Sequence, residues 1–354
     1  MMKRHGRYWA IVVALGVLWP VSGSAGESGF QTIRFWKKYY TARRHECWPS
    51  FVRLKKPQRR KIGERHYSLE GTRLIEKSQD VDTRTKIGVI SAPKDSSRLT
   101  QENIAYFMKY FRRVGVDWLV GHGDVGYDAT KIEALIWPMV NINAPVLFMV
   151  GNGESVPEFN DAVAKLMAKR KNVYNLNFTR LIEGDDAILV SVPGYYDPLY
   201  VYSEEGCVYK SRDLQRLRQL ISGDERKPLV LVSHGPPRGR GKHAIDMVYK
   251  GDHVGDHNLG KLMDDLDIHI GIFGHILESG GRGTTRNHRV VKPGEWSDSL
   301  YVNAGSASAI PWQLLGGDKS YGMAMMVVIE GGRTQFEVLP SALQRLHDAG
   351  GKRR

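Results

Sequence analysis

The chain has 354 residues, of which 42% are hydrophobic and 25% charged, so it is long and apolar enough to bury a substantial core and is not a disordered chain. Its formal net charge of +13 at pH 7 predicts affinity for anions such as nucleic acid, anionic lipid or a phosphorylated small molecule. Much of the excess lies between residues 34 and 65, where Lys and Arg far outnumber Glu. This distribution argues against a nucleic-acid-binding role for the whole molecule.

The N-terminus has the pattern of an export signal. Three basic residues precede an apolar run from residue 8 to 18, and small residues follow it up to Ala25. This pattern predicts a signal peptide over residues 1–25 and a protein exported to the periplasm or secreted. The apolar run is shorter than the roughly 20 residues of a membrane span. An uncleaved membrane anchor is the alternative.

Residues 26–82 show no sustained apolar period and mix aromatic with basic side chains. Such a composition suits a membrane surface or nucleic acid. The preferred interpretation is an extended, solvated arm that packs loosely on the main domain. Cys47 in this arm and Cys207 are the only cysteines. An oxidising compartment would allow them to pair, and the sequence leaves this open.

After residue 82 strands and helices alternate. A helix with Thr100 as its N-cap is predicted by the apolar residues that recur on one face up to Val114. The other predicted elements of this half are a strand at 86–90, a strand at 118–120, a helix at 132–136, a strand at 146–150 and a helix at 157–170. This succession predicts a sheet wrapped by helices.

The second half is richer in strands. Six are predicted, at 187–192, 229–233, 269–273, 300–303, 323–329 and 335–339, with helices at 213–221 and 257–266. We therefore predict one α/β domain over residues 83–342, made of two packed sheets with helices outside. Residues 343–354 are expected to form a disordered tail.

Four predicted strands end in a polar side chain beside a glycine, namely Asp124, Asn152, His234 and His275. Open α/β sheets bind ligands at the carboxyl ends of their strands. A carboxylate, an amide carbonyl and two imidazoles together suit Zn, Mn or Fe in an open site. Each residue alone would be an ordinary turn residue, but four at successive strand ends indicate a metal site.

The order of these motifs resembles the calcineurin-like metallophosphoesterase superfamily. The resemblance rests on Gly123-Asp124, Gly151-Asn152, Ser233-His234-Gly235 and Gly274-His275, and it extends over residues 86–339. It implies a four-layer α/β/β/α sandwich with two metal ions at the strand ends. In that family the ions share a hydroxide that attacks phosphorus in line.

The resemblance implies that the ligands of one metal are retained. Asp124 falls on the bridging carboxylate, and Asn152, His234 and His275 fall on the other protein ligands of the second metal. One divalent transition metal (Mn, Zn or Fe) is therefore the expected cofactor. A conventional two-metal centre is not expected.

The ligands of the first metal are missing. The family's Asp-x-His after the first strand is Ala92-Pro93-Lys94 here, and the second histidine of Gly-His-x-His is Leu277. The histidine that assists the leaving group in the family is Gly153. The Lys94 ammonium would occupy roughly the place of the lost cation and hold Asp124 or a phosphate oxygen. The alternative is a solvated loop lysine.

Four other polar residues near these motifs are assigned roles. Glu154 is a general acid or base only if its pKa is raised. His253 and His257 are expected to contact substrate or to cap a helix rather than to bind metal. His122, which shares a strand face with Asp124, is expected to support that carboxylate.

Two functions remain open at this stage. The first is an exported phosphoric-ester hydrolase acting on a phosphomonoester or diester, with Asp124, Lys94 and Glu154 as catalytic residues. The second is an inactive pseudoenzyme that binds an anionic ligand or a partner protein through the same cleft. The basic arm would add a membrane contact, whereas the case for nucleic acid is weaker.

Overall fold

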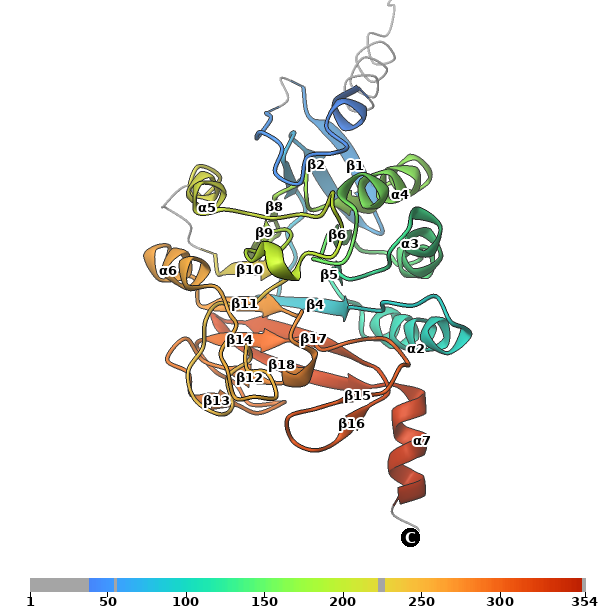
Figure 1. The fold of residues 1–354 in the computed structure, drawn as a ribbon. Coiled ribbons are helices and arrows are strands. Elements are labelled where there is room, and N and C mark those ends of the chain that lie inside the picture. The colour runs from blue at the N-terminus through green and yellow to red at the C-terminus, as the bar shows by residue number, and fades with distance from the viewer. Residues whose placement is uncertain (1–37, 54–55, 222–226, 352–354) are drawn as a thin grey trace, which may run out of the picture.

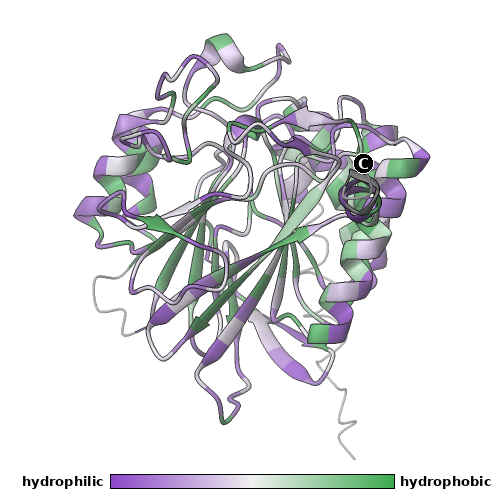
Figure 2. Cartoon of the chain, turned by 90° about the horizontal axis from the view of Figure 1, so that it is seen from below, coloured by the Kyte–Doolittle hydropathy of each residue, from purple (hydrophilic) through white to green (hydrophobic). Residues whose placement is uncertain are grey.

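The computed structural model describes residues 38–53, 56–221 and 227–351. Two β-sheets lie face to face, with helices on the outer flanks (Figures 1 and 2). The first sheet has ten strands in the order β1-β2-β3-β8-β9-β10-β11-β14-β12-β13, and the second has six in the order β18-β17-β4-β5-β6-β7. The predicted signal peptide lies outside the described residues. None of the helices in the described part is long and apolar enough to cross a membrane.

The strands of the ten-stranded sheet are β1 (Gln58–Ile62), β2 (Arg65–Leu69), β3 (Arg73–Glu76), β8 (Leu181–Glu183), β9 (Ile188–Val192), β10 (Leu229–Ser233), β11 (Ile270–Phe273), β14 (Leu300–Asn303), β12 (Gly283–Thr284) and β13 (Val290–Val291). Those of the six-stranded sheet are β18 (Arg333–Pro340), β17 (Met323–Glu330), β4 (Arg84–Ser91), β5 (Trp118–His122), β6 (Val146–Met149) and β7 (Val173–Asn175). A separate small hairpin joins β15 (Trp312–Gln313) and β16 (Lys319–Ser320).

The α-helices are α2 (Arg98–Val114), α3 (Ala129–Ile136), α4 (Val156–Lys169), α5 (Ser211–Leu217), α6 (His257–Asp265) and α7 (Ala342–Gly351). The described residues also include three short 3₁₀ helices, η1 (Trp137–Val140), η2 (Pro198–Tyr200) and η3 (Leu277–Ser279), and residues 38–42 are helical as well.

Three buried apolar clusters define the layers. The central cluster lies between the two sheets and includes Val120 and Val232. A second joins the six-stranded sheet to α2, α3 and α4, with Phe107 and Phe159 among its members, and a third joins the ten-stranded sheet to α5 and α6. The predicted four-layer α/β/β/α sandwich is therefore confirmed. Because both faces of the central strands are covered, their sequences are almost continuously apolar.

The central strands of each sheet run parallel. In one sheet β4, β5, β6 and β7 pair in parallel, and in the other β9, β10, β11 and β14 do so. Parallel neighbours end at the same edge of a sheet. The loops after β4, β5, β6, β10 and β11, which carry the predicted site residues, are therefore gathered at one end of the sandwich.

Helix α2 begins earlier than the sequence predicted. Its N-cap is Ser97, whose side chain accepts a hydrogen bond from the Thr100 backbone, and its C-cap is Gly115 with φ of 65°. Thr100, the expected cap, is buried, and its hydroxyl donates to Asp95 at 2.8 Å. Ile104, Phe107 and Phe111 form the buried face as the spacing indicated.

Residues 58–76 form part of the sheet, although the sequence set residues 26–82 apart as a loosely packed arm. β1 and β2 form a hairpin, β2 pairs with β3, and β3 pairs in parallel with β8. The strand pattern was hidden because β1 alternates between exposed and partly buried residues and carries its basic side chains on a solvated edge.

The C-terminal segment also differs from its prediction. Residues 342–351 form α7 where a disordered tail was expected from 343. The Ser341 hydroxyl accepts from the Gln344 amide at 3.0 Å, and the Tyr321 and His347 rings stack with centroids 4.0 Å apart. A side-chain cap and an aromatic contact thus order a segment whose own sequence has only a weak helical pattern.

A disulfide bond joins Cys47 to Cys207. It ties the segment before β1 to the loop before α5, across a sequence separation of 160 residues. The sequence left this pairing open. Because it closes a long loop, the bond is expected to stabilise the fold mainly by restricting the unfolded chain.

We predict that replacing both cysteines, Cys47→Ala and Cys207→Ala, lowers the free energy of unfolding by about 2–4 kcal/mol. Guanidinium denaturation under non-reducing conditions measures this change. Reduction of the wild-type protein before denaturation is the matched control and should give a similar loss. An unchanged denaturation midpoint in both experiments would show that the bond contributes nothing to stability.

Candidate metal centre

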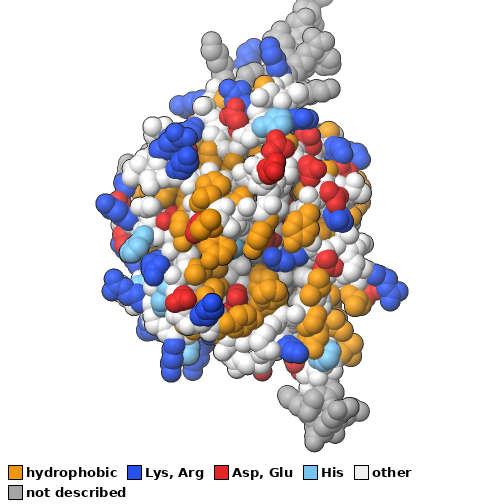
Figure 3. Space-filling view, viewed as in Figure 1, with side chains coloured by type: hydrophobic (Ala, Val, Ile, Leu, Met, Phe, Trp, Pro, Cys, Tyr) orange, Lys and Arg blue, Asp and Glu red, His pale blue; other side chains and the backbone are white. Residues whose placement is uncertain are grey.

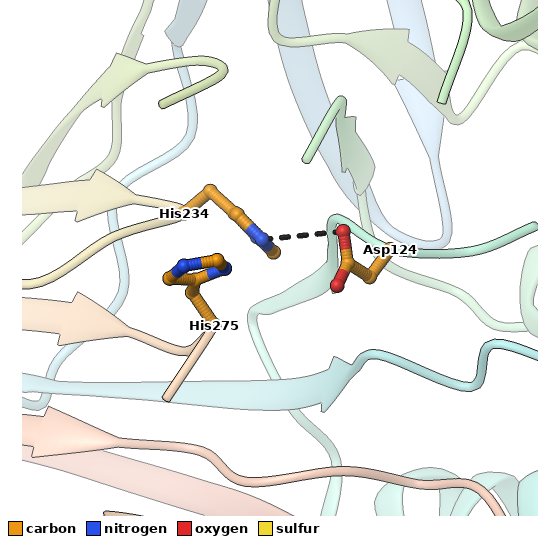
Figure 4. Close-up of side chains that lie close together, drawn as sticks. All are labelled: Asp124, His234 and His275. Atoms are coloured by element: carbon orange, nitrogen blue, oxygen red, sulfur yellow. Dashed lines mark ion pairs between the residues drawn. The ribbon is translucent and has the colours of Figure 1, made fainter. Parts of the chain in front are cut away.

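Four predicted ligands converge at the edge formed by the parallel strands. Asp124 follows β5, Asn152 follows β6, His234 directly follows β10 and His275 follows β11. Figure 4 shows the side chains of Asp124, His234 and His275 pointing toward one another from three separate segments. The two sheets thus contribute both halves of the site, the acid and amide from one and the imidazoles from the other.

The distances within this group fit a single ion. The Asn152 Oδ1 atom lies 2.8 Å from His234 Nε2 and 2.9 Å from His275 Nδ1, and Asp124 Oδ1 lies 3.3 Å from His234 Nε2. Asp124, His234 and His275 each offer one ligand atom within 4.8 Å of the others. Ligand atoms about 2.1 Å from a common ion are roughly 3.0–3.4 Å apart. The Asp124–His234 distance lies in this range, whereas the two Asn152 distances are hydrogen-bond lengths that would have to open slightly around an ion. Two imidazoles, a carboxylate and an amide oxygen therefore suit one divalent transition metal.

Glycines permit the close approach of these segments. A Cβ atom on Gly151 would lie 2.5 Å from the Asp124 backbone nitrogen and 2.6 Å from its Oδ1 atom. Both distances are far below contact distance. The glycine that precedes Asn152 is thus required for Asp124 and Asn152 to share one site.

Backbone strain is concentrated at the same place. Six described non-glycine residues have a positive φ, and four of them belong to the site: Ala92 (44°), Lys94 (58°), Asp124 (50°) and His275 (63°). Such a conformation costs on the order of 1–3 kcal/mol per residue and persists only where surrounding structure enforces it. The strain identifies these loops as the functional edge of the sandwich.

Lys94 makes the closest contact to the free side of the Asp124 carboxylate. Its Nζ atom lies 2.9 Å from Asp124 Oδ2, and its backbone nitrogen donates to the Asp124 carbonyl at 3.0 Å. The opposite oxygen, Oδ1, accepts from the Gly153 amide at 3.1 Å and faces His234. The two oxygens of the Asp124 carboxylate thus contact different partners, because Oδ2 contacts the Lys94 ammonium and Oδ1 faces the His234 imidazole.

Lys94 and Asp124 each stabilise the charged form of the other. Burial disfavours ionisation of Asp124, but the attraction of His234 and Lys94 outweighs it and holds the pKa of Asp124 well below its usual value. Burial would also lower the pKa of Lys94, yet Asp124 raises it. At neutral pH the site therefore holds a carboxylate and an ammonium in contact.

The positions that the resemblance assigns to a first metal offer no ligand. Ala92 is buried, and its carbonyl accepts from the Ser306 hydroxyl at 2.6 Å. Leu277 lies on η3 and lines the same cleft as Lys94 and Asp124. A methyl group, an ammonium and an isobutyl group cannot bind a cation, so the side of Asp124 that faces Lys94 has no described metal ligand other than the carboxylate itself.

Glu154 lies beneath the site and does not line the cleft. Its carboxylate is fully buried and accepts hydrogen bonds from the backbone amides of Gly151 (2.8 Å) and Val125. Burial and the charge of Asp124 raise the pKa of Glu154 to about 7. Glu154 therefore has the raised pKa that the sequence analysis required for acid or base behaviour. Its position, however, ties the Asp124 turn to the Asn152 turn and gives it no described contact with the open cleft.

His122 connects the two sheets rather than contacting Asp124. Its Nε2 atom donates to the Ser233 carbonyl at 2.8 Å, across the sandwich from β5 to β10, and its ring stacks on His234 with centroids 5.7 Å apart. Burial, followed by the charge of His234, lowers the pKa of His122 to about 3, so the ring is neutral at physiological pH. It supports the His234 ligand directly and Asp124 only through it.

His253 and His257 lie away from the predicted metal. His253 Nδ1 lies 2.9 Å from Asp246 Oδ1, and His257 is the first residue of α6. Both line a separate hollow, whose residues do not include Lys94, Asp124 or Asn152. The structure thus groups Lys94 with the four predicted ligands and places the two histidines elsewhere.

The cleft above the ligands has an aromatic wall that the sequence analysis missed. Its volume is about 540 Å³. Five aromatic side chains line it: Tyr195, Tyr200, Tyr202, Tyr249 and Trp312. Figure 3 shows hydrophobic side chains gathered over the middle of this face. The available signal was the density of tyrosine between residues 195 and 202, directly after a predicted strand.

Comparison with known families decides the assignment. The sequence model described as calcineurin-like phosphoesterase matches residues 100–279, half of the chain and all four ligand motifs. The chain belongs to the calcineurin-like phosphoesterase family. No curated protein sequence matches it closely enough to be reported as a relative.

Comparison with solved structures supports the fold of this calcineurin-like phosphoesterase through one match. One, 10% identical, matches with a TM-score of 0.54 over 73% of this chain and 100% of its own. A dimetal phosphatase from Danio rerio is 11% identical, with a TM-score of 0.45 over 73% of this chain and 99% of its own. A purple acid phosphatase from yellow lupin (Lupinus luteus) is 9% identical, with a TM-score of 0.37 over 79% and 57%. At such identities the first match supports the fold alone, and the other two add no argument.

Restoring the missing ligands tests the assignment of Ala92, Lys94 and Leu277 to a lost first-metal site. We predict that the triple variant Ala92→Asp, Lys94→His and Leu277→His binds a second divalent ion per chain, because these are the three positions that the resemblance assigns to the first-metal ligands. Titration with Mn²⁺ followed by isothermal calorimetry measures the stoichiometry. Lys94→His alone is the control and should not gain the second ion. A triple variant with unchanged stoichiometry would mean that these positions do not correspond to the family's ligands.

Proposed function

We propose that this protein is an exported phosphoesterase that works with one divalent transition metal and uses Lys94 in place of a second. The observation that carries this proposal is the 2.9 Å contact between Lys94 Nζ and Asp124 Oδ2. This contact puts a positive charge on the side of the Asp124 carboxylate that the retained ligands do not occupy. The proposed metal ligands are Asp124, Asn152, His234 and His275.

The roles of the protein groups follow from their positions. Asp124 and the two imidazoles would hold the ion, and a divalent ion supplies Lewis-acid polarisation of a phosphoryl oxygen when bound. Lys94 lines the cleft beside Asp124 and would bind a second phosphoryl oxygen by a charge-assisted hydrogen bond. This arrangement supports two contacts to one phosphate group, one on each side of Asp124.

The remainder of the substrate is suggested by the cleft wall. Tyr200, Tyr202 and Tyr249 each expose between 46% and 69% of their surface, and Trp312 exposes 38%. Exposed aromatic rings around a small polar floor suit a planar or apolar group attached to the phosphate. We therefore propose a phosphomonoester or diester whose organic part is apolar or aromatic.

Export is supported by two independent features. The N-terminal pattern is that of a signal peptide. The Cys47–Cys207 disulfide suits an oxidising compartment such as the periplasm or the extracellular space, because cytosolic thiols are kept reduced.

A binding protein without turnover is the second candidate, and one position favours it. Gly153 stands where the family has a histidine that assists the leaving group, and a glycine has no side chain to donate a proton. Lys94 would then hold a phosphate ester in the cleft without promoting its cleavage.

Hydrolysis of bis(p-nitrophenyl) phosphate and p-nitrophenyl phosphate, with Mn²⁺, Zn²⁺ or Fe²⁺ added, separates these candidates. We expect metal-dependent turnover that His234→Ala abolishes, because this variant removes the ligand nearest to both Asp124 and Asn152. Lys94→Ala should retain the metal but lose about tenfold or more in kcat/KM, since a charge-assisted contact to the phosphate contributes about 1.5–3 kcal/mol.

Exposed Lys109 on α2 provides the matched control for the loss of a lysine, and Lys109→Ala should behave as wild type. Wild-type turnover equal to that of His234→Ala with every metal, together with retained binding of p-nitrophenyl phosphate, would refute the hydrolase and establish the binding protein. Undiminished turnover in Lys94→Ala would refute the role of this lysine.

A further inference from the structure

A second hollow, larger than the metal cleft, opens beside it. Its volume is about 670 Å³. Most of its lining comes from three segments: the loop 237–241 after β10, helix α6 along its whole length, and the stretch from β12 towards β13. Figure 3 shows basic and histidine side chains gathered along the left edge of the molecule, where Figure 1 places α6 and β13.

The lining of this hollow is strongly basic. Seven of its residues carry a positive or titratable nitrogen, namely Arg238, Arg240, His253, His257, Lys261, Arg286 and His288. Two carboxylates, Asp264 and Asp265, are the acidic residues in the lining. The balance of charge therefore favours an anion.

The acidic groups already have cationic partners. Asp264 Oδ1 lies 2.9 Å from Arg286 Nε, and Asp265 forms an ion pair with Arg218. The Asp246 carboxylate, which is fully buried, pairs with His253 at 2.9 Å. None of these carboxylates is left over to neutralise the remaining cations.

Three cations in the lining have no ion-pair partner among the described residues, namely Arg238, Arg240 and Lys261. Arg238 and Arg240 come from the loop after β10, and Lys261 comes from α6, so the charges stand on two different walls. His288 and Arg240 both line the hollow, and burial and then the charge of Arg240 lower the pKa of that histidine. The hollow thus holds an excess of about three positive charges that protein groups do not compensate.

We propose that this hollow is a second binding site, for a small molecule that carries two or more phosphate groups. Its volume lies within the roughly 300–1,000 Å³ of small-molecule sites. Its three uncompensated charges, which come from two different segments, match an oligophosphate better than a single phosphate. A concave site of this size does not suit a nucleic acid, which requires an extended basic stripe.

The new site is distinct from the metal cleft but shares a wall with it. Val248, Tyr249 and Val254 line the metal cleft, whereas His253 of the same segment lines the basic hollow. The Val254 carbonyl accepts hydrogen bonds from the hydroxyls of Tyr195 and Tyr196, both at 3.0 Å. A ligand in the hollow would therefore contact a segment fixed to the aromatic wall of the cleft.

Binding of inorganic tripolyphosphate to the full mature protein tests the proposal, by isothermal calorimetry at 0.15 M salt without added metal. We expect wild type to bind tripolyphosphate at least about tenfold more tightly than inorganic phosphate. The double variant Arg238→Glu and Lys261→Glu should lose about tenfold or more in affinity, because it reverses two of the three unpaired charges in the lining. Both side chains are exposed, so the fold should tolerate the change.

Two controls locate the site. Lys109→Glu with Lys171→Glu makes the same change in net charge at exposed positions by α2 and α4, and its affinity should change less than about twofold, because salt screens charges beyond about 8 Å. Lys94→Ala removes the cation of the metal cleft and so reports any anion bound there, and it should lose less affinity for tripolyphosphate than Arg238→Glu with Lys261→Glu does.

Four outcomes would overturn the proposal, the last of them its preference for more than one phosphate group. The first is no tripolyphosphate binding by wild type at millimolar concentration, and the second is an equal loss in the remote charge-reversal variant. The third is a loss in Lys94→Ala without a loss in Arg238→Glu with Lys261→Glu, which would place the anion in the metal cleft. Equal affinity for phosphate and tripolyphosphate would refute the preference for more than one phosphate group.

Discussion

The structure of the site depends on how the Asp124 carboxylate is neutralised. An ionised carboxylate is costly to bury unless charged or hydrogen-bonding partners surround it. Lys94 satisfies Oδ2, while His234 and the Gly153 amide face Oδ1. The left-handed backbone at Lys94 and Asp124 is the conformation in which these contacts form, and the backbone hydrogen bond between the same two residues maintains it. These contacts support the proposal that Lys94 takes the place of a second metal ion.

Two buried groups hold this arrangement without entering the cleft. Glu154 accepts two backbone amides from the turns that carry Asp124 and Asn152, and His122 joins the two sheets through the Ser233 carbonyl directly before His234. Each fixes a loop end relative to its neighbour. The ligand geometry is therefore prepared before any ion or substrate arrives, which reduces the entropy that binding must offset.

Much of the fold and the ligand set could be predicted because both depend on local patterns. Continuous apolar runs mark strands covered on both faces, and a polar residue beside glycine at a strand end marks the ligand edge. The β1–β3 strands escaped prediction because an edge hairpin with one solvated face has no continuous apolar run. The separation of His253 and His257 from Lys94 also could not be predicted. Neighbours along the segment 248–254 line two different hollows, and the tertiary contacts that hold this segment, such as the hydrogen bonds from Tyr195 and Tyr196 to the Val254 carbonyl, leave no signal in the sequence.

The metal content of the mature wild-type protein tests the central claim most directly. Native mass spectrometry after incubation with excess Mn²⁺, Zn²⁺ or Fe²⁺ measures how many ions each chain holds, without reliance on any substrate. The account predicts one ion per chain in wild type, one in Lys94→Ala and none in His234→Ala. Two ions per wild-type chain would contradict it, because the Lys94 ammonium and a second metal ion cannot both contact Asp124 Oδ2 at close range.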